Sequence, residues 1–249
     1  MSEKIVIRTS DEGIAYLKMN DTEGKNIFRD DFLDELLKGL DAISEIKPKV
    51  LILHGLDDVF SGGAEKELLI DLCDGKIKVK DLLVSEKLVN LNFPVIAAME
   101  GHAVGGGLAM ALCCDIVIAA LESRYGAVFM SLGFTPGMGT TTLLQELMGP
   151  FIANEMMFTA KRFKGSELAN KGTNINYILP KKDVMKKAED IAVQISEKNA
   201  KSVHLLKYTL STRKKKLLTE ARLQEDMMHA LSFGYPETRE TIERFYAGN

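Results

Sequence analysis

Two glycine-rich segments carry the clearest chemical signal in the sequence, residues 60–65 (FSGGAE) and residues 101–107 (GHAVGGG). Each follows an apolar run and opens into an apolar helical pattern. A glycine turn before a helix lets the backbone approach a ligand and directs free N–H groups at it. Two such turns can place two backbone donors on one oxygen, and each donor stabilises a developing oxyanion by roughly 3 kcal/mol. The two segments together predict an oxyanion hole for an enolate or a tetrahedral intermediate.

Other glycine-rich and nucleophilic motifs do not fit the sequence. Residues 101–107 lack the G-x-G-x-x-G register of a dinucleotide site and the Gly-Lys-Ser/Thr ending of a P-loop. The chain has no G-x-S-x-G, no H-E-x-x-H and no cysteine–histidine motif. The predicted reaction therefore uses neither a nucleophilic side chain nor a metal.

The elements that position these segments follow an α/β pattern. Residues 5–7 and 14–17 predict a hairpin of two strands, and residues 32–46 predict an amphipathic helix. Apolar runs at 50–53, 94–98 and 116–120 predict strands that are buried on both faces of a parallel sheet. From residue 149 onward the pattern is almost wholly helical, which indicates a helical region and not a second sheet domain.

The composition is typical of a globular protein of the cytoplasm. Of 249 residues, 46% are hydrophobic and 27% are charged, and the net charge of −3 disfavours nucleic acid as the main partner. Cys73, Cys113 and Cys114 lack zinc or redox spacing and are predicted to be reduced. We find no signal-peptide pattern at the start and no apolar stretch that would span a membrane.

The chain resembles the crotonase (enoyl-CoA hydratase/isomerase) superfamily along essentially its whole length. The resemblance rests on residues 60–64, 101–110, 114–119 (CDIVIA), 133–139 (GFTPGMG) and 158–172. It implies an α/β crotonase fold, a spiral of ββα units over residues 1–195, and a C-terminal helical trimerisation region over residues 196–249. It also implies that the backbone amides of Ala64 and Gly106 form the oxyanion hole.

Two carboxylates that hydratases of this family use are missing. One position lies two residues after the glycine triplet, where this chain has Ala109, and the other lies four residues before Gly133, where it has Phe129. Water addition needs paired acid and base groups at the double bond, so a hydratase is not expected. The predicted surroundings are apolar instead and suit decarboxylation. The predicted substrate pocket comprises Gly105, Phe129, Phe134 and Met138.

Residues 25–28 (KNIF), 133–139 and 227–229 (MMH) resemble a narrower group, the crotonase-type decarboxylases of polyketide β-branching cassettes. The resemblance implies decarboxylation of a 3-methylglutaconyl thioester to a 3-methylcrotonyl thioester, with a catalytic histidine at His229 and a catalytic lysine. Matching the segment after Gly75 places that lysine at Lys78, with Lys76 and Lys80 as rivals. Some members of the group place it nearer the helix of the first segment, where this chain has Leu72.

The residues alone leave simpler interpretations open for both side chains. His229 lies beside an apolar stripe that includes Leu223, Met227 and Leu231, and Glu225 lies one turn before it. A surface histidine paired with Glu225 would explain that spacing equally well. The alternating lysines after Gly75 also fit an ordinary solvated stretch.

The predicted partner is an acyl carrier protein or coenzyme A that bears the thioester, and the resemblance implies a homotrimer or a dimer of trimers. No metal or redox cofactor is expected, and neither nucleic acid nor a membrane is an expected partner. Two alternatives remain: an enoyl thioester isomerase that uses His229 as its base, and a non-catalytic crotonase-fold scaffold or RNA binder. The acidic balance disfavours RNA, and the two complete glycine segments disfavour the scaffold.

Overall fold

The computed structural model describes residues 3–79 and 82–247. Its larger sheet has six strands, in the order β1-β2-β3-β5-β7-β10. They are β1 (Ile5–Thr9), β2 (Ile14–Met19), β3 (Val50–His54), β5 (Val95–Met99), β7 (Ile116–Ala120) and β10 (Tyr177–Leu179). The β1–β2 pair is the predicted antiparallel hairpin, and the other pairs are parallel. Every residue of β3 and β5 is buried, as their continuous apolar runs predict.

A second sheet has four short strands, in the order β4-β6-β8-β9. They are β4 (Val59–Ser61), β6 (His102–Val104), β8 (Arg124–Gly126) and β9 (Phe163–Lys164). Three times in succession, a strand of the large sheet leads to a strand of the small sheet and then to a helix. The three helices are α2 (Lys66–Cys73), α4 (Gly106–Cys113) and the 3₁₀ helix η2 (Val128–Leu132). This repeat is the predicted spiral of ββα units.

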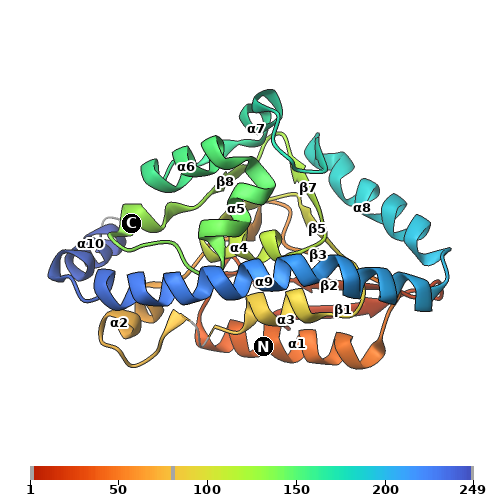
Figure 1. Cartoon of the computed structure of the whole chain (residues 1–249), viewed down its shortest axis with the longest axis horizontal. Helices are drawn as coiled ribbons and strands as arrows, with labels where there is room; N and C mark the ends of the chain where they lie inside the picture. Colours follow the sequence, from red (N-terminus) through yellow and green to blue (C-terminus); the bar gives the residue numbers. More distant parts are fainter. Residues whose placement is uncertain (1–2, 80–81, 248–249) are drawn as a thin grey trace.

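Helices cover both faces of the large sheet. On one face lie α1 (Asp30–Ile46) and α3 (Val84–Asn90), and α8 (Lys181–Ser196) packs on the other through Val184, Ala188 and Ala192. The longest helix, α9 (Ala200–Ser232), extends along the whole molecule and contacts α3 and α5 (Thr140–Met148) (Figure 1). The last helix, α10 (Pro236–Ala247), packs against α2 and η2 at one end of the molecule (Figure 1).

The prediction of an almost wholly helical second half is corrected in detail. The helices α6 (Pro150–Thr159) and α7 (Gly165–Lys171) are present, but β9 separates them and β10 follows α7. These strands have two and three residues, too few for an alternating pattern to appear in the sequence. The division of the chain at residues 195 and 196 stays a prediction. No helix in the described ranges is long and apolar enough to cross a bilayer.

Candidate active site

The Ala64 segment is held from one side by Phe28. The Phe28 N–H donates to the Gly63 carbonyl at 2.6 Å, and the Glu65 N–H donates to the Phe28 carbonyl at 3.0 Å. In such a parallel bridge, both polar groups of the intervening residue point away from the partner strand. The N–H of Ala64 accordingly makes no hydrogen bond to another described residue. It is available to an oxygen in the cavity that Ala64 lines.

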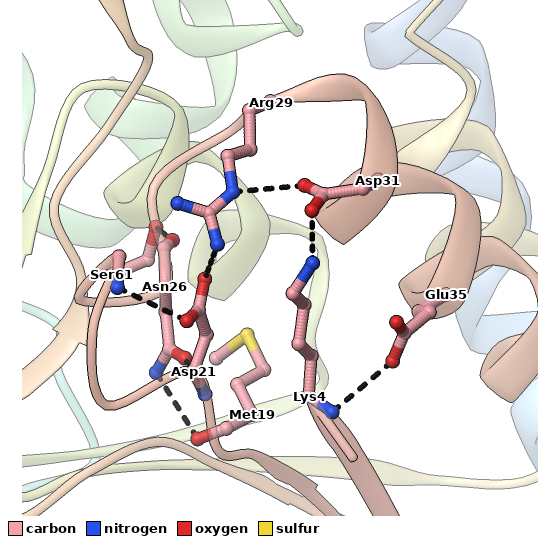
Figure 2. A network of polar contacts seen from close by, with 9 residues as sticks. Lys4, Met19, Asp21, Asn26, Arg29, Asp31, Glu35 and Ser61 are labelled. Atoms are coloured by element: carbon pink, nitrogen blue, oxygen red, sulfur yellow. Dashed lines mark hydrogen bonds and ion pairs between the residues drawn. The ribbon is translucent and has the colours of Figure 1, made fainter. Parts of the chain in front are cut away.

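A buried network ties the Phe28 loop to this segment (Figure 2). Asn26 is fully buried in a left-handed conformation, and its Nδ2 donates to the carbonyls of Met19 and Phe60 at 3.1 and 3.0 Å. The Ser61 hydroxyl donates to the Asn26 carbonyl at 2.7 Å (Figure 2). Asparagine tolerates this conformation better than most residues. The network explains why the KNIF motif accompanies the first glycine segment: it fixes the position of the Ala64 donor.

The second donor begins α4. Gly105 has a φ of +55° and places Gly106 at the first helical position, where the N–H has no intrahelical acceptor. The Gly106 N–H makes no hydrogen bond to another residue in the described ranges. A Cβ on Gly106 would lie 2.5 Å from the Phe28 ring and 3.3 Å from the Met138 sulfur, so only glycine fits there. The two segments pack closely against each other: a Cβ added to Gly63 of the first segment would lie only 3.2 Å from the carbonyl oxygen of Val104 in the second.

Ala64 and Gly106 both line one cavity of about 290 Å³. Its wall includes the predicted pocket residues Gly105, Phe129, Phe134 and Met138. Phe134 contacts Phe129 edge to face, with ring centroids 5.9 Å apart, and stacks on Phe233 of the region between α9 and α10 at 4.5 Å. No aspartate or glutamate among the described residues lines this cavity. Apart from Arg162, His229 and Tyr246, the described side chains in its wall are apolar.

His229 lines the same cavity from α9. The side chain is buried, and its Nε2 lies 3.0 Å from the Thr135 carbonyl, which can only accept, so Nε2 carries the proton. Nδ1 is buried without a hydrogen-bond partner. Burial lowers the pKa of His229, and the bond to the Thr135 carbonyl opposes that effect. A Cβ on Gly137 would lie 2.6 Å from the imidazole ring, so this glycine permits the close approach.

The structure contradicts the surface interpretation of His229. Glu225 is buried, and its carboxylate accepts from the N–H groups of Gly139 and Thr141 at 2.7 and 3.0 Å. The expected apolar stripe is also not the buried face of the helix. Leu223, Met227 and Leu231 are 66%, 73% and 63% exposed. The buried face carries Arg222, Glu225 and His229 instead, each with polar partners that lie far away in the sequence.

Lys78 lies at a neighbouring cavity of about 320 Å³, which Asp226 also lines. The two cavities share Leu72, Val79 and His229 as walls. Lys78 does not line the cavity of the two donors as the structure stands.

The two rivals of Lys78 differ in position. The side chain of Lys76 is 61% exposed and pairs with Asp71 and Asp74 at 2.6 and 3.3 Å, and Lys76 lines neither cavity. Lys80 lies outside the described residues. The catalytic role of any of the three stays a prediction.

The other histidines lie elsewhere. His102 is exposed, and its Nδ1 accepts from the Arg124 N–H at 2.9 Å. His54 ends β3 in a buried position, and burial lowers its pKa to about 4. Neither lines the cavity of the two donors. Among the described residues, no group of three histidine, cysteine, aspartate or glutamate side chains is arranged to hold a metal ion.

The buried His54 predicts acid sensitivity. The unfolded chain takes up this proton near pH 6.5 and the folded chain only near pH 4, so stability falls as the pH falls between these values. The loss amounts to about 3 kcal/mol at most. Glutamine at position 54 cannot titrate, so the free energy of unfolding of His54→Gln lacks this pH dependence. We expect the difference in free energy of unfolding between the wild type and His54→Gln, measured by urea unfolding, to become smaller as the pH drops from 7.5 to 4.5. A difference that stays constant over this range would contradict the assignment; the difference at pH 7.5 measures the cost of the substitution itself.

Sequence reasoning missed two polar residues that line the cavity. Arg162, between α6 and β9, contributes an exposed guanidinium side chain, and Tyr246 of α10 contributes a phenol. Tyr246 donates from its hydroxyl to the Ala64 carbonyl at 2.7 Å. No local pattern in the sequence marks either residue, because each reaches the cavity only through the packing of α6 or α10.

A spiral of ββα units that joins two backbone donors over an apolar chamber is the architecture of enzymes that stabilise the oxyanion of an acyl thioester. The chain belongs to the enoyl-CoA hydratase/isomerase family, whose model matches residues 9–247. The crotonase fold expected from the sequence is confirmed.

The similar proteins include decarboxylases. The bacillaene synthase decarboxylase PksI of Bacillus subtilis is 35% identical over 95% of this chain and 95% of its own. A solved structure from a dehydratase/decarboxylase enzyme couple of polyketide β-branching matches with a TM-score of 0.94 and 34% identity, over 99% of this chain and all of the other. The ECH2 decarboxylase domain of CurF from Lyngbya majuscula matches with a TM-score of 0.91 and 31% identity, over 98% and 100%. The narrower resemblance to this group is thereby confirmed.

Proposed function

We propose that the protein decarboxylates a 3-methylglutaconyl thioester to a 3-methylcrotonyl thioester in polyketide β-branching. One observation carries the proposal: no described aspartate or glutamate lines the cavity that holds both oxyanion donors. Phe129 lies in the wall and Ala109 is buried in α4, at the positions where hydratases have carboxylates. Hydration needs such groups and decarboxylation does not. The likeness to PksI and to the CurF domain supports the same reaction.

The two amides would act in the bond-breaking step. The thioester carbonyl binds between the N–H groups of Ala64 and Gly106. The bond between the terminal carboxylate and its neighbouring carbon breaks, CO2 leaves, and the electron pair moves through the double bond onto the thioester oxygen. The apolar wall disfavours the negative charge at the carboxylate, whereas the two donors stabilise it at the oxygen.

His229 would supply the proton of the second step. The approach of the substrate carboxylate raises the pKa of the buried imidazole, so Nδ1, which has no partner among the described residues, takes up a proton on binding. Once CO2 has left, the imidazolium faces a dienolate whose negative charge now lies on the thioester oxygen. It then returns to the neutral form by protonating the dienolate at carbon, which restores a neutral thioester.

Lys78 would orient the carboxylate. It lines the cavity that shares Leu72, Val79 and His229 with the donor cavity, which places it next to the proposed substrate site. A lysine that held the carboxylate tightly would slow the departure of CO2, so we assign it orientation and not charge stabilisation.

The thioester carrier is proposed to be an acyl carrier protein, with coenzyme A as the alternative. A homotrimer or a dimer of trimers, which the family resemblance implies, is also proposed. The large apolar side chains that α9 leaves exposed support association between chains. Those with more than half of their surface exposed are Leu205, Leu206, Tyr208, Leu210, Leu223, Met227 and Leu231. Sedimentation should give a mass that is a multiple of three chains of 27.5 kDa, and a monomer would contradict this proposal. The cytoplasmic location stays a prediction.

The reaction can be tested on the intact carrier. We expect incubation with a 3-methylglutaconyl carrier protein to remove the mass of one CO2, as measured by mass spectrometry. The same enzyme should hydrate a crotonyl thioester at close to the uncatalysed rate, since the cavity lacks the carboxylates. A variant in which the Ala64 donor is removed serves as the negative control. Efficient hydration without loss of CO2 would overturn the assignment.

A further inference from the structure

Tyr246 joins the last helix to the first oxyanion segment. Its hydroxyl donates to the Ala64 carbonyl at 2.7 Å, and its ring lines the donor cavity. Burial, together with the nearby carboxylates of Glu67 and Glu65, raises the pKa of Tyr246. The phenol therefore stays protonated throughout the neutral range and can donate the hydrogen bond to the Ala64 carbonyl.

Phe28 holds the peptides on both sides of Ala64, and Tyr246 adds a second contact to the peptide that follows it. Phe28 binds the Gly63 carbonyl and the Glu65 N–H from one side. Tyr246 binds the Ala64 carbonyl from the other side, where the Ala64 N–H also points. Gly63, immediately before, has a φ of +96° and no Cβ, so the chain there resists rotation weakly. A second contact beyond Ala64 limits the rotation that Gly63 permits.

The helix that carries Tyr246 is itself anchored at two further points. The Thr238 hydroxyl donates to the Gly133 carbonyl at 2.8 Å, and Arg239 pairs with Asp74 at the end of α2. The phenol thus comes from a helix seated on η2 and α2, which also line or border the cavity. A helix held in this way can set the position of a backbone group with which it makes one hydrogen bond.

We propose that Tyr246 is a positioning residue for the oxyanion hole: its hydroxyl holds the peptide between Ala64 and Glu65, which limits rotation of the chain at Ala64 and keeps the Ala64 N–H directed at the thioester oxygen. This inference rests on the proposed function, because it takes the cavity as the site of the oxyanion. The hydroxyl acts through Ala64 and transfers no proton itself. Its effect is greatest where charge accumulates on the thioester oxygen.

The test compares Tyr246→Phe with Tyr235→Phe, which removes a hydroxyl from an exposed tyrosine between α9 and α10. Phenylalanine keeps the ring in the cavity wall. We expect Tyr246→Phe to lower kcat by about tenfold while KM changes less than twofold, because the loss falls on the developing charge. Tyr235→Phe should leave both constants unchanged. Unchanged kcat in Tyr246→Phe would overturn the proposal.

A binding measurement separates positioning from a purely structural role. Two substrate analogues are used: a nitronate, which carries negative charge at the position of the enolate oxygen, and a thioether without the carbonyl. The affinity of Tyr246→Phe should fall about tenfold for the nitronate and stay constant for the thioether. Equal losses for both ligands, with a lower Tm, would show that the hydroxyl merely holds the fold, and would overturn the proposal. The comparison of the two affinity losses requires no turnover, so it still tests the proposal if the wild-type enzyme fails to decarboxylate the proposed substrate.

Discussion

Replacing Ala64 by lactic acid is expected to lower kcat by about 10²- to 10³-fold, which is the effect of losing one preorganised oxyanion donor. The exchange turns the Gly63–Ala64 amide into an ester, which removes the N–H and leaves the Gly63 carbonyl a weaker acceptor for the Phe28 N–H. The fold should survive, because the Ala64 N–H makes no hydrogen bond to another described residue and Phe28 bonds to the residues on either side. Stopped-flow or mass-spectrometric turnover with the carrier-bound substrate measures kcat, and the midpoint of thermal unfolding checks the fold.

The same exchange at Gly106, to glycolic acid, should cause a loss of similar size. It avoids the Cβ that would lie 2.5 Å from the Phe28 ring, so it isolates the donor from the steric effect of Gly106→Ala. The matched control is a lactic acid exchange at Ala42, an exposed position of α1 that lines neither the donor cavity nor the cavity beside Lys78. Full activity of a folded Ala64 or Gly106 ester would remove the oxyanion hole from the mechanism.

The sequence allowed the two glycine turns that meet at the cavity to be predicted because their signal is local. A glycine turn between a buried strand and a helix has a backbone geometry that few other sequences satisfy, and both 60–65 and 101–107 show it. The large sheet was predictable for the same reason, since β3, β5 and β7 are continuous apolar runs. β9 and β10 were missed because two or three residues carry no periodicity.

Helix α9 shows why the rest of the site could not be predicted. Apolar periodicity predicts the buried face of a helix in a single globular chain. Here Leu223 and Met227 face outward, whereas Glu225 and His229 face inward. Their partners, Gly139 with Thr141 and the Thr135 carbonyl, lie more than 80 residues earlier in the chain. Hydrogen bonds between residues so far apart in the chain leave no pattern in the sequence, so only the family resemblance singled out His229.

The prediction for His229 rests on the two ring nitrogens having separate tasks. Nε2 donates to the Thr135 carbonyl at 3.0 Å and holds the ring, while the buried Nδ1 has no partner in the described part of the chain. In His229→Gln, the side-chain amide can still donate to Thr135 but cannot titrate. We expect kcat to fall by about 10²- to 10⁴-fold, the usual contribution of a positioned proton donor, with little change in Tm.

The pH dependence distinguishes proton transfer from packing. Burial lowers the pKa of His229 in the free enzyme, so the imidazole is neutral at pH 7, and the substrate carboxylate must raise that pKa for Nδ1 to take up a proton. Above the pKa of the enzyme–substrate complex the imidazole stays neutral and cannot protonate the dienolate. The kcat of the wild type should therefore decline as the pH rises through that value, and the residual kcat of His229→Gln should not. Both pH profiles of kcat are measured from pH 6 to pH 9 with saturating substrate. Parallel declines of the two profiles would mean that a group other than His229 delivers the proton. Full activity of His229→Gln would show that His229 takes no part in the chemistry.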